Sequence, residues 1–456
     1  MKKRAVRPVG SAAVAHEPRM STQTLQRRLT RERATFQQLI AEAPRELARH
    51  YIRHSSLELN ETAYLLGYED ANSFFRACHQ WEGTSPGEWR AQQARLSKAL
   101  KLRTRNGKED SMRYQPLGRT GLYVSELCLG AMTFGGNGFW AAIGKLGSKE
   151  AESLIGAAFD AGVNFIDTAD VYSDGDSEQL VGAALAALGR PREQVVVATK
   201  VRGRVGPGVN QVGLSRAHIL ASIDGSLKRL GLDHVDLYQI HGFDPATAIE
   251  ETVRALDDVV RSGKARYVGF SNLPAWQASK AITFAQENGL ARFQSAQVYY
   301  SIAGRDIERE IAPLCQAEGV AILPWSPLAG GLLSGKFDPE KKGPADARRA
   351  SFDFPPVSME RLPRVLGALR NVSEAMDVSL ARIALAWQLT KPFVTSIIIG
   401  AKRMEQLLDN LAAVDAKLAP EHVKLLDEAS ALPAEYPGWM VDLQNSRDPR
   451  GQGKML

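Results

Sequence analysis

Residues 162–185 read GVNFIDTADVYSDGDSEQLVGAAL, and this stretch contains the change of apolar spacing that decides the fold. The run NFIDT is short and apolar, as expected of a buried strand. In the run that follows, SEQLVGAALAALGRP, Gly189 lies where a helix would end and Pro191 forbids its continuation. The apolar residues of that run share one helical face: Leu180, Val181, Ala184, Leu185 and Leu188. The stretch therefore predicts a strand, a loop and a helix.

The same strand–helix unit recurs along most of the chain. A second helical run, SRAHILASIDGSLKRLG, again keeps its apolar residues in register. Eight such units, largely 25 to 40 residues apart, favour a closed (β/α)8 TIM barrel over an open doubly wound sheet. The predicted strands begin near Glu126, Asn164, Val195, Val235, Ala265, Phe293, Val320 and Phe393.

The first 110 residues differ from the rest in charge. They hold 20 Lys and Arg against 12 Asp and Glu, a net of +8, whereas the remainder has 37 against 39, a net of −2. A positive excess confined to one end fits a phosphate-binding module on a neutral body, although a solvated basic arm would give the same excess. The polar run LSKALKLRTRNGKEDSMRY predicts a linker at 97–111.

Cysteine usage and hydropathy restrict the protein class. The three cysteines, Cys78, Cys128 and Cys315, are too few and too far apart for a disulfide framework or a close-spaced zinc site. No apolar run approaches the roughly 18 residues of a membrane span. The basic start MKKRAVRPVG is not followed by a secretory apolar core. We expect a soluble, cytoplasmic protein with no metal site and no membrane partner.

Polar residues follow the second, third and fourth predicted strands. These residues are Asp167, with Tyr172 in the next loop, Lys200 and His241. Loops at the carboxyl ends of barrel strands form the active site, so the four side chains are expected to meet at one rim. A lone lysine or histidine there would more often be structural. Together, an ammonium held by a carboxylate can lower the pKa of a phenol, and a neutral imidazole can orient a carbonyl oxygen.

Residues 113–440 resemble the aldo-keto reductase superfamily. The resemblance rests on RYQPLGRTGLYVSELCLGAMTFG, GVNFIDTADVYSDGDSEQLVGAAL, VVVATKV, VDLYQIHGFDP and VGFSNL, in that order. It implies that Asp167, Tyr172, Lys200 and His241 are the catalytic tetrad, with Tyr172 as the general acid. It also implies reduction of an aldehyde or ketone with a nicotinamide cofactor, usually NADPH, bound without a Rossmann domain. No Gly-x-Gly-x-x-Gly follows a strand, and GGLLSGKF lacks the Ser or Thr of a P-loop.

The resemblance also implies a cofactor site. Ser271, Asn272 and Gln297 would contact the carboxamide, and Trp325 the nicotinamide face. The run SPLAGGLLSGK would hold the pyrophosphate through Ser326, Leu328, Gly330 and Lys336. The run IGAKRMEQLLDN would hold the adenosine end through Gly400, Ala401, Arg403, Gln406, Asp409 and Asn410. Relatives with arginine at the position of Gln406 use it on the 2′-phosphate, so Arg403 or Lys402 must replace it here, and NADPH is favoured over NADH.

The substrate side is less defined by the sequence. Met132, Trp140, Tyr172 and Phe243 would form an apolar mouth suited to aldehydes, including aromatic ones. For Trp140, simple packing within its loop is an equally good explanation.

The basic front end resembles the double helix-turn-helix of AraC/XylS-type regulators. In LNETAYLLGYEDANSFFRACHQWEGTSPGEWR, Ala63 and Leu66 fit a first helix, Gly67 the turn, and Phe74 and Ala77 the inner face of a recognition helix. Outward-facing residues of the two units would read DNA: Gln23, Gln26 and Arg27 in the first, and Asn72 and Arg76 in the second. Pro18 and Arg33 depart from the pattern of the first unit.

The sequence thus predicts an all-α AraC-type module at 8–96, a linker at 97–111, a reductase barrel at 112–440 and a tail at 441–456. The predicted function is NADP-dependent reduction of carbonyls by a chain that also binds double-stranded DNA. Two alternatives remain: a transcriptional regulator whose barrel senses redox state or a carbonyl ligand, or an enzyme fused to a remnant module. The substrate, the operator and the oligomeric state are not defined by the sequence.

Overall fold

The computed structural model describes residues 48, 52, 57–68, 70–82, 84–88, 90, 112–336, 349 and 352–446. The chain divides into two compact units, Met1–Glu109 and Asp110–Leu456. The predicted linker and the predicted DNA-reading residues Gln23, Gln26 and Arg27 lie outside the described residues.

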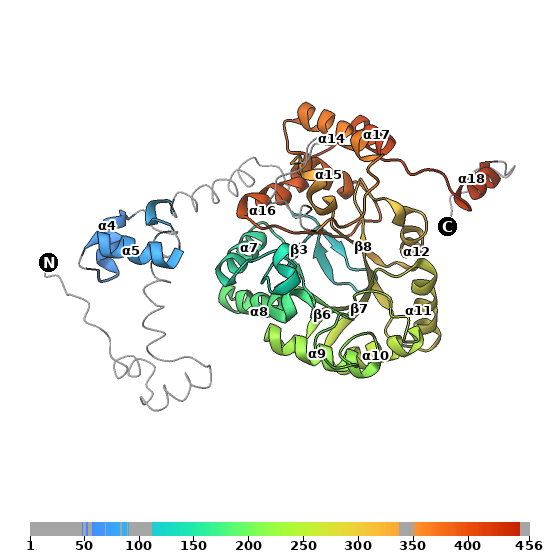
Figure 1. Cartoon of the computed structure of the whole chain (residues 1–456), viewed down its shortest axis with the longest axis horizontal. Coiled ribbons are helices and arrows are strands. Elements are labelled where there is room, and N and C mark those ends of the chain that lie inside the picture. The colour runs from blue at the N-terminus through green and yellow to red at the C-terminus, as the bar shows by residue number, and fades with distance from the viewer. Residues whose placement is uncertain are drawn as a thin grey trace. The chain divides into compact units, whose positions relative to one another are not determined.

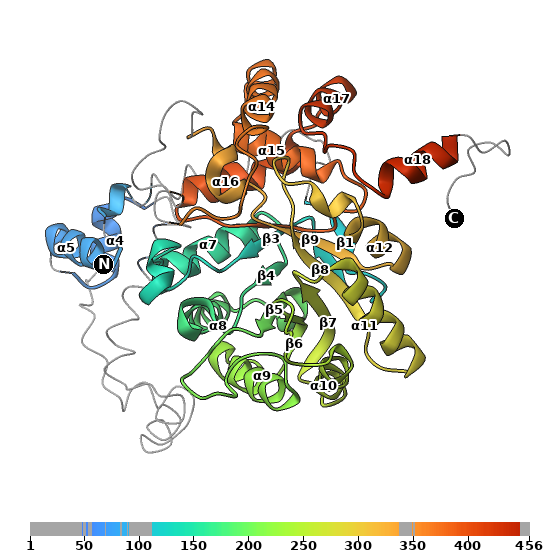
Figure 2. The same ribbon diagram turned by 45° about the vertical axis from the view of Figure 1, so that its right-hand side comes forward.

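The second unit is an eight-stranded parallel barrel surrounded by helices (Figures 1 and 2). Its strands pair in the order β10-β3-β4-β5-β6-β7-β8-β9. A hydrogen bond of 2.9 Å from Thr395 N to Ile322 O links β9 to the segment before β10 and closes the ring. The strands are β3 (Leu127–Gly130), β4 (Phe165–Asp167), β5 (Val196–Val201), β6 (Val235–Ile240), β7 (Ala265–Ser271), β8 (Phe293–Tyr299), β9 (Ala321–Trp325) and β10 (Ile397–Ile399).

Helices connect successive strands and cover the barrel. The predicted helix after β4 is α8, and Gly189 ends it in the left-handed conformation, with φ of 59°. The helices between β3 and β9 are α7 (Ser148–Asp160), α8 (Asp176–Leu188), α9 (Arg216–Leu230), α10 (Ile249–Arg261), α11 (Ala275–Glu287) and α12 (Ile311–Glu318). Those described after β9 include α14 (Leu362–Met376), α15 (Leu380–Leu389), α16 (Met404–Leu411), α17 (Pro420–Ala429) and α18 (Gly438–Ser446). The described part of the unit also contains the 3₁₀ turns η1 (Gly138–Ala142), η2 (Tyr172–Gly175), η3 (Arg192–Gln194), η4 (Asp306–Glu308), η5 (Ala329–Ser334) and η6 (Ala412–Asp415).

An apolar plug fills the amino-terminal end of the barrel. The antiparallel hairpin of β1 (Tyr114–Pro116) and β2 (Tyr123–Ser125) precedes β3 at that end. Leu117 and Val124 from this hairpin are buried with Phe165 and Leu237 of the barrel strands. Because this end is filled, the opposite end, where the strands finish, is the one available for a site.

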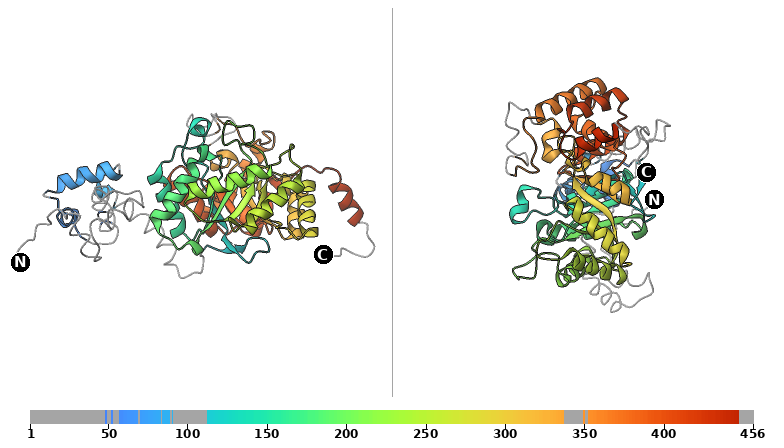
Figure 3. Two further views of the ribbon diagram at one scale, coloured as in Figure 1. Left: turned by 90° about the horizontal axis from the view of Figure 1, so that it is seen from below. Right: turned by 90° about the vertical axis from the view of Figure 1, so that its right-hand side faces the viewer.

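Two features of the carboxyl-terminal region differ from a plain barrel. The last strand was expected from Phe393, but it starts at Ile397, because Val394 N donates to Lys391 O and completes a turn. Val394 keeps only an isolated bridge to Ile322. Helix α18 has no buried residue and stands apart from the barrel helices (Figure 3).

In the first unit the described residues include two helices, α4 (Leu59–Leu65) and α5 (Ala71–Glu82). They are separated by a turn in which Gly67 has φ of 85°, a conformation that favours glycine, as predicted. Ala63 and Phe74 are buried, also as predicted. The prediction for Ala77 was wrong: it is half-buried, and Cys78, one helical turn after Phe74, is the second buried residue of α5.

The described part of the chain contains no helix that is both long enough and apolar enough to cross a membrane. Within that part, no group of His, Cys, Asp and Glu is arranged to hold a metal ion. The three cysteines are buried.

Candidate active site

Four predicted residues, Asp167, Tyr172, Lys200 and His241, come together at the carboxyl end of the barrel. Asp167 ends β4 and Lys200 lies near the end of β5. His241 directly follows β6, and Tyr172 begins η2. The side-chain amine of Lys200 lies 2.5 Å from Asp167 Oδ2 and 3.3 Å from the Tyr172 hydroxyl. The Tyr172 and His241 rings meet edge to face, with centroids 5.6 Å apart.

Lys200 is fully buried, and all of its hydrogen atoms on nitrogen are engaged. Nζ donates to Asp167 Oδ2, to Thr168 O at 2.8 Å and to the Tyr172 hydroxyl. Burial acts to lower the pKa of Lys200, but the Asp167 carboxylate and the Tyr172 phenol outweigh burial and raise that pKa above its usual value. Lys200 is therefore a permanent ammonium. Because it donates to the phenol oxygen, the phenol's own hydrogen is directed elsewhere.

Two glutamines hold the Asp167 carboxylate from the barrel interior. Gln297 Nε2 donates to Asp167 Oδ1 at 2.8 Å, and Gln239 Nε2 donates to the same oxygen at 3.2 Å. Gln297 was predicted to contact a cofactor carboxamide, and here it contacts Asp167. Gln239 was missed by sequence reasoning, although a glutamine inside the apolar run of β6 was a usable signal.

His241 is neutral throughout the physiological range. Burial, and then the positive charges of Lys200 and Arg202, lower the pKa of His241 to about 3. A neutral imidazole can hydrogen-bond a carbonyl oxygen without carrying charge into a buried site. Its backbone oxygen accepts from Asn272 Nδ2 at 3.1 Å, which ties the loop after β6 to the loop after β7.

A second acidic group lies behind the four residues. Asp170 is buried, and neither of its carboxylate oxygens has a side-chain hydrogen-bond partner among the described residues. Burial, and then the charge of Glu178, raise the pKa of Asp170 to about 8. Glu178 itself is held by Thr199 at 2.5 Å and by Arg229 at 2.6 Å. The loop that presents Tyr172 thus rests on a carboxyl group that is protonated at neutral pH.

Of the residues predicted to form the apolar mouth, Trp140 contacts Tyr172 directly. The Trp140 ring contacts the Tyr172 ring, with centroids 5.2 Å apart, so Trp140 does more than pack within its own loop. Met132 is half-buried. Phe243 is 37% exposed, and its backbone oxygen accepts from Arg202 Nε at 2.7 Å.

The predicted nicotinamide contacts form a chain of hydrogen bonds along the barrel rim. Trp325 Nε1 donates to Asn272 Oδ1 at 3.1 Å, and Asn272 Nδ2 donates to Ser271 Oγ at 2.9 Å. Asn272 and Ser326 have φ of 54° and 52°, an unusual conformation for non-glycine residues. Such strained backbone is typical of functional sites.

The predicted pyrophosphate loop is built around η5. Gly330 has φ of 66°, and a Cβ there would lie 2.5 Å from Phe354 O, so only glycine fits. Lys336 is exposed, and Ser326 and Leu328 are half-buried. Sequence reasoning missed Arg349, whose Nη1 donates to Ala329 O at 3.0 Å and to Pro355 O at 2.9 Å. This guanidinium lies against the loop although it comes from 13 or more residues further along the chain.

The predicted adenosine contacts surround the start of α16. Arg403 immediately precedes the helix, and Gln406 Oε1 accepts from Lys402 N at 2.9 Å. Asn410 Nδ2 donates to Gly400 O at 3.3 Å, and Ala401 is buried. Asp409 already accepts hydrogen bonds from Ser379 and Arg382 of the preceding helix region, at 2.6 and 2.8 Å.

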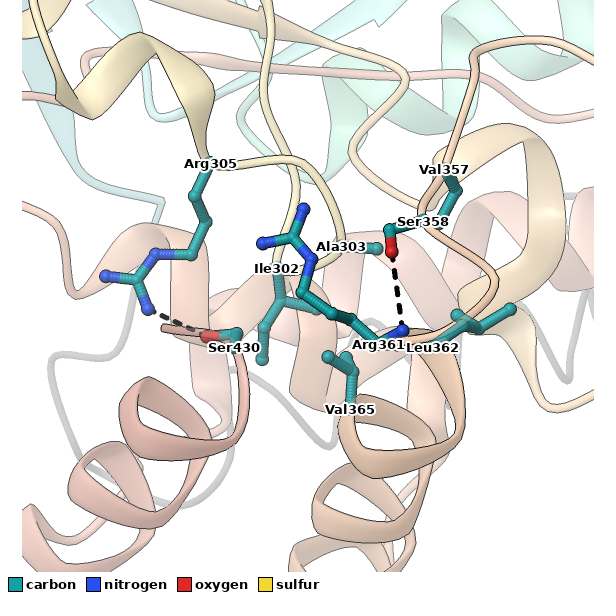
Figure 4. A pocket seen from close by; sticks show the side chains of 9 residues that line it. All are labelled: Ile302, Ala303, Arg305, Val357, Ser358, Arg361, Leu362, Val365 and Ser430. Carbon is teal, nitrogen blue, oxygen red and sulfur yellow. Dashed lines mark hydrogen bonds between the residues drawn. The ribbon is translucent and has the colours of Figure 1, made fainter. Parts of the chain in front are cut away.

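A separate small hollow lies between η4, α14 and α17 (Figure 4). Arg305, which lines the hollow, forms an ion pair with Glu308 at 2.8 Å and donates a hydrogen bond to Ser430 Oγ at 2.7 Å. Ser358 Oγ accepts from Arg361 N at 3.4 Å on the other side of the hollow. These bonds join elements of the barrel shell, and the hollow is far in sequence from the four residues above.

Comparison with known proteins decides the class of the barrel. The model of the aldo/keto reductase family matches residues 126–431. The chain belongs to the aldo/keto reductase family. The family match covers every strand from β3 to β10, and the barrel is accordingly an oxidoreductase domain.

Several relatives align over most of their own length. A probable voltage-gated potassium channel subunit beta from Oryza sativa is 39% identical over 69% of this chain and 96% of its own. A putative aryl-alcohol dehydrogenase of Schizosaccharomyces pombe is 37% identical over 69% and 95%. A versiconal hemiacetal acetate reductase of Aspergillus parasiticus is 36% identical over 72% and 99%.

A helix-turn-helix domain model matches residues 14–92. This aldo/keto reductase therefore carries an AraC-type DNA-binding fold ahead of its barrel. In the described part of that fold, Asn72 and Arg76 are exposed on α5, as predicted for a recognition helix. Arg76 Nη2 donates to Ser73 Oγ at 3.2 Å.

Proposed function

We propose that the protein is an NADPH-dependent reductase of aldehydes or ketones that also binds DNA in a sequence-specific manner. In this proposal residues 8–96 form the DNA-binding module, 97–111 the linker, 112–440 the reductase and 441–456 a tail. The observation that carries the proposal is the bonding of Lys200, whose ammonium is held by Asp167 and Thr168 O and donates to the Tyr172 hydroxyl at the carboxyl end of the barrel.

Tyr172 is the proposed proton donor. The carbonyl carbon accepts a hydride while the carbonyl oxygen takes the phenolic proton, which yields an alcohol. Lys200 stabilises the phenolate that remains, and Asp167 holds Lys200 in place. His241, neutral and next to Tyr172, orients the carbonyl oxygen. Solvent restores the proton of Tyr172 after the product leaves.

The chain's own residues suit a nicotinamide dinucleotide. A bound nicotinamide cofactor supplies the hydride in this chemistry. Trp325, Ser271 and Asn272 offer an indole face and polar groups beside the four residues. The glycine-dependent turn at Gly330 suits a pyrophosphate, with Ser326, Leu328 and Lys336 on the same loop. Arg349 braces this loop through its bond to Ala329 O.

The adenosine end is the proposed source of cofactor preference. Gly400, Ala401, Gln406 and Asn410 would line it, whereas Asp409 acts by holding α16 to Ser379 and Arg382. Arg403, at the start of α16, would pair with the 2′-phosphate of NADPH, because helix starts and guanidinium groups both favour phosphate. Lys402 is the alternative partner.

The substrate is proposed to be a small apolar carbonyl compound. Met132, Trp140 and Phe243 lie in the loops after β3 and β6 and would contact it. The names of two relatives, an aryl-alcohol dehydrogenase and a hemiacetal acetate reductase, are consistent with this class.

The DNA-binding part of the proposal rests on α5. Asparagine and arginine on an exposed recognition helix can bind adenine and guanine edges in the major groove. Gln23, Gln26 and Arg27 would do the same in the first helix-turn-helix. The net charge of +8 in residues 1–110 would add sequence-independent attraction to phosphates.

Two measurements on the purified full chain test the proposal. NADPH oxidation in the presence of a panel of aldehydes and ketones should show turnover, and its absence across the panel would leave the sensor alternative in its place. Selection of binding sites from random double-stranded DNA, at stated salt, should recover a motif. No motif would reduce the module to a remnant, whereas a motif whose affinity changes with NADPH would favour the regulator.

A further inference from the structure

Six aromatic side chains form a continuous series of ring contacts at the open end of the barrel. We call Tyr172, Trp140, Phe139, Phe352, Phe354 and Trp325 the aromatic belt. Successive ring centroids along it are 5.2, 5.5, 5.2, 5.4 and 5.6 Å apart. The series begins at the proposed proton donor.

Polar contacts bring the two ends of the aromatic belt together. Trp325 donates to Asn272, and Asn272 donates to the backbone of His241. The His241 ring contacts the Tyr172 ring. The contacts therefore make a circuit that starts and ends at the proposed catalytic groups, so the belt rings lie next to the position proposed for the carbonyl.

The outer part of the belt comes from two loops that are distant in the sequence. Phe139 and Trp140 lie in η1, between β3 and α7, whereas Phe352 and Phe354 lie between β9 and α14. The two loops meet where the Phe139 and Phe352 rings cross at 89°. Phe139 is 60% exposed and Phe352 is half-buried, so this meeting point is not a buried core. Exposed apolar groups clustered at a site commonly contact a ligand.

We propose that the aromatic belt, through Phe139 and Phe352 in particular, selects flat aromatic carbonyl compounds over saturated ones of similar size. This inference rests on the proposed reductase function and adds its substrate class and two specificity-determining residues. Around Phe139 the belt rings meet edge to face, with interplanar angles of 77° to Trp140 and 89° to Phe352. An aromatic guest gains edge-to-face contacts that a saturated ring cannot make, because these depend on the ring quadrupole.

The test compares two substrates and four proteins. The ratio of kcat/KM for benzaldehyde to that for cyclohexanecarbaldehyde is measured with NADPH in the wild type, Phe139→Leu, Phe352→Leu and Tyr123→Leu. Leucine keeps the sites apolar but removes the ring. Tyr123 is the matched control, because it is 57% exposed and lies in the hairpin at the opposite end of the barrel. The two aldehydes differ in intrinsic reactivity. Because this difference is the same for all four proteins, it cancels when the ratio in a variant is compared with the ratio in the wild type.

In each belt variant the ratio should fall by a factor of about 2 to 12, the range that one aromatic pair contributes. It should stay unchanged in Tyr123→Leu. An unchanged ratio in both belt variants would overturn the proposal while leaving the reductase function intact.

A binding measurement keeps the two proposals separable. Calorimetric titration of the same four proteins with benzamide and cyclohexanecarboxamide, in the presence of NADPH, needs no turnover. Loss of preference for the aromatic amide in the belt variants alone would support the belt even if no carbonyl were reduced. Equal affinity for both amides in the wild type would refute it even if turnover were observed.

Discussion

Lys200 in the barrel and Arg76 in α5 are both cations predicted to function at a binding site, the first for a carbonyl compound and the second for DNA. The protein holds the two side chains in different ways. Lys200 is fully buried and bonded to groups from β4 and η2, up to 33 residues away in the sequence. Arg76 is exposed and donates to Ser73, three residues earlier on the same helix. The barrel site is thus organised by contacts between distant segments, whereas Arg76 is held by a contact within its own helix.

The largest effect is expected on the rate of carbonyl reduction when the proposed proton donor, Tyr172, is replaced. Tyr172→Phe removes the proton donor but keeps the ring that packs against Trp140 and His241. The kcat/KM for carbonyl reduction should fall by about 10²–10⁴, the usual contribution of positioned acid catalysis. NADPH affinity, measured by fluorescence titration, should barely change. A variant with most of its activity would show that the buried cluster is structural and would break the contrast with α5.

The second effect concerns Asp170, the buried carboxyl group two residues before Tyr172. Burial and Glu178 keep its folded pKa at about 8, against the favourable charges of Arg229 and Lys200, whereas the unfolded chain should lose this proton near pH ~3.9. Between these values the folded state binds more protons than the unfolded state, so the free energy of unfolding decreases as pH rises. The decrease is at most about 1.4 kcal/mol per pH unit and ends above about pH 8.

Asp170→Asn cannot ionise and should remove this dependence. Its thermal midpoint relative to wild type should therefore rise steadily from about pH 5 to about pH 8, followed by differential scanning calorimetry. Asp174→Asn, at an exposed position of the same loop, is the control and should show no such trend. Parallel curves for wild type and Asp170→Asn would mean that Asp170 is ionised in the folded protein.

The third effect concerns Arg403, an exposed cation like Arg76, which is proposed to bind the 2′-phosphate of NADPH. Arg403→Ala should weaken NADPH binding about ten- to a hundredfold, since a charge-assisted hydrogen bond contributes roughly 1.5–3 kcal/mol. NADH binding should change little, because NADH lacks the 2′-phosphate. The same titrations on Lys402→Ala identify the alternative partner. Equal losses for both cofactors in Arg403→Ala would place the phosphate contact elsewhere.

The smallest effect is expected on α5. On a selected DNA site, Arg76→Ala should cost about 1–3 kcal/mol and relax base preference at one position. Lys3→Ala should instead weaken specific and random DNA alike and reduce the salt dependence of binding. Fluorescence anisotropy at two salt concentrations separates these outcomes. If Arg76→Ala behaved like Lys3→Ala, α5 would contribute charge without sequence recognition.

The sequence predicted what depends on local pattern and strand order. The alternation of apolar runs predicted the barrel, and the ends of three successive strands predicted that Asp167, Lys200 and His241 would meet near Tyr172. It did not predict contacts made between distant segments, such as Arg349 on the η5 loop, Gln239 on Asp167 or Phe352 against Phe139. Such contacts depend on how loops cross in space, which no spacing within one segment encodes.

Two smaller errors of the sequence prediction, the start of β10 and the inner face of α5, arise from alternatives of similar local pattern. An apolar run beginning at Phe393 fits a strand, but a turn that ends at Val394 takes its first residues. On α5, Ala77 and Cys78 are adjacent and both small, so periodicity alone did not decide which of them faces the interior.

The complete engagement of Lys200 has a consequence for chemical durability. Aldehydes condense with unprotonated lysine amines to form imines, and a reductase of aldehydes is exposed to them at each turnover. Lys200 has a raised pKa, no exposed surface and no lone pair available on its nitrogen. The arrangement that stabilises the phenolate of Tyr172 therefore also protects the lysine from covalent capture by the compounds that the site admits.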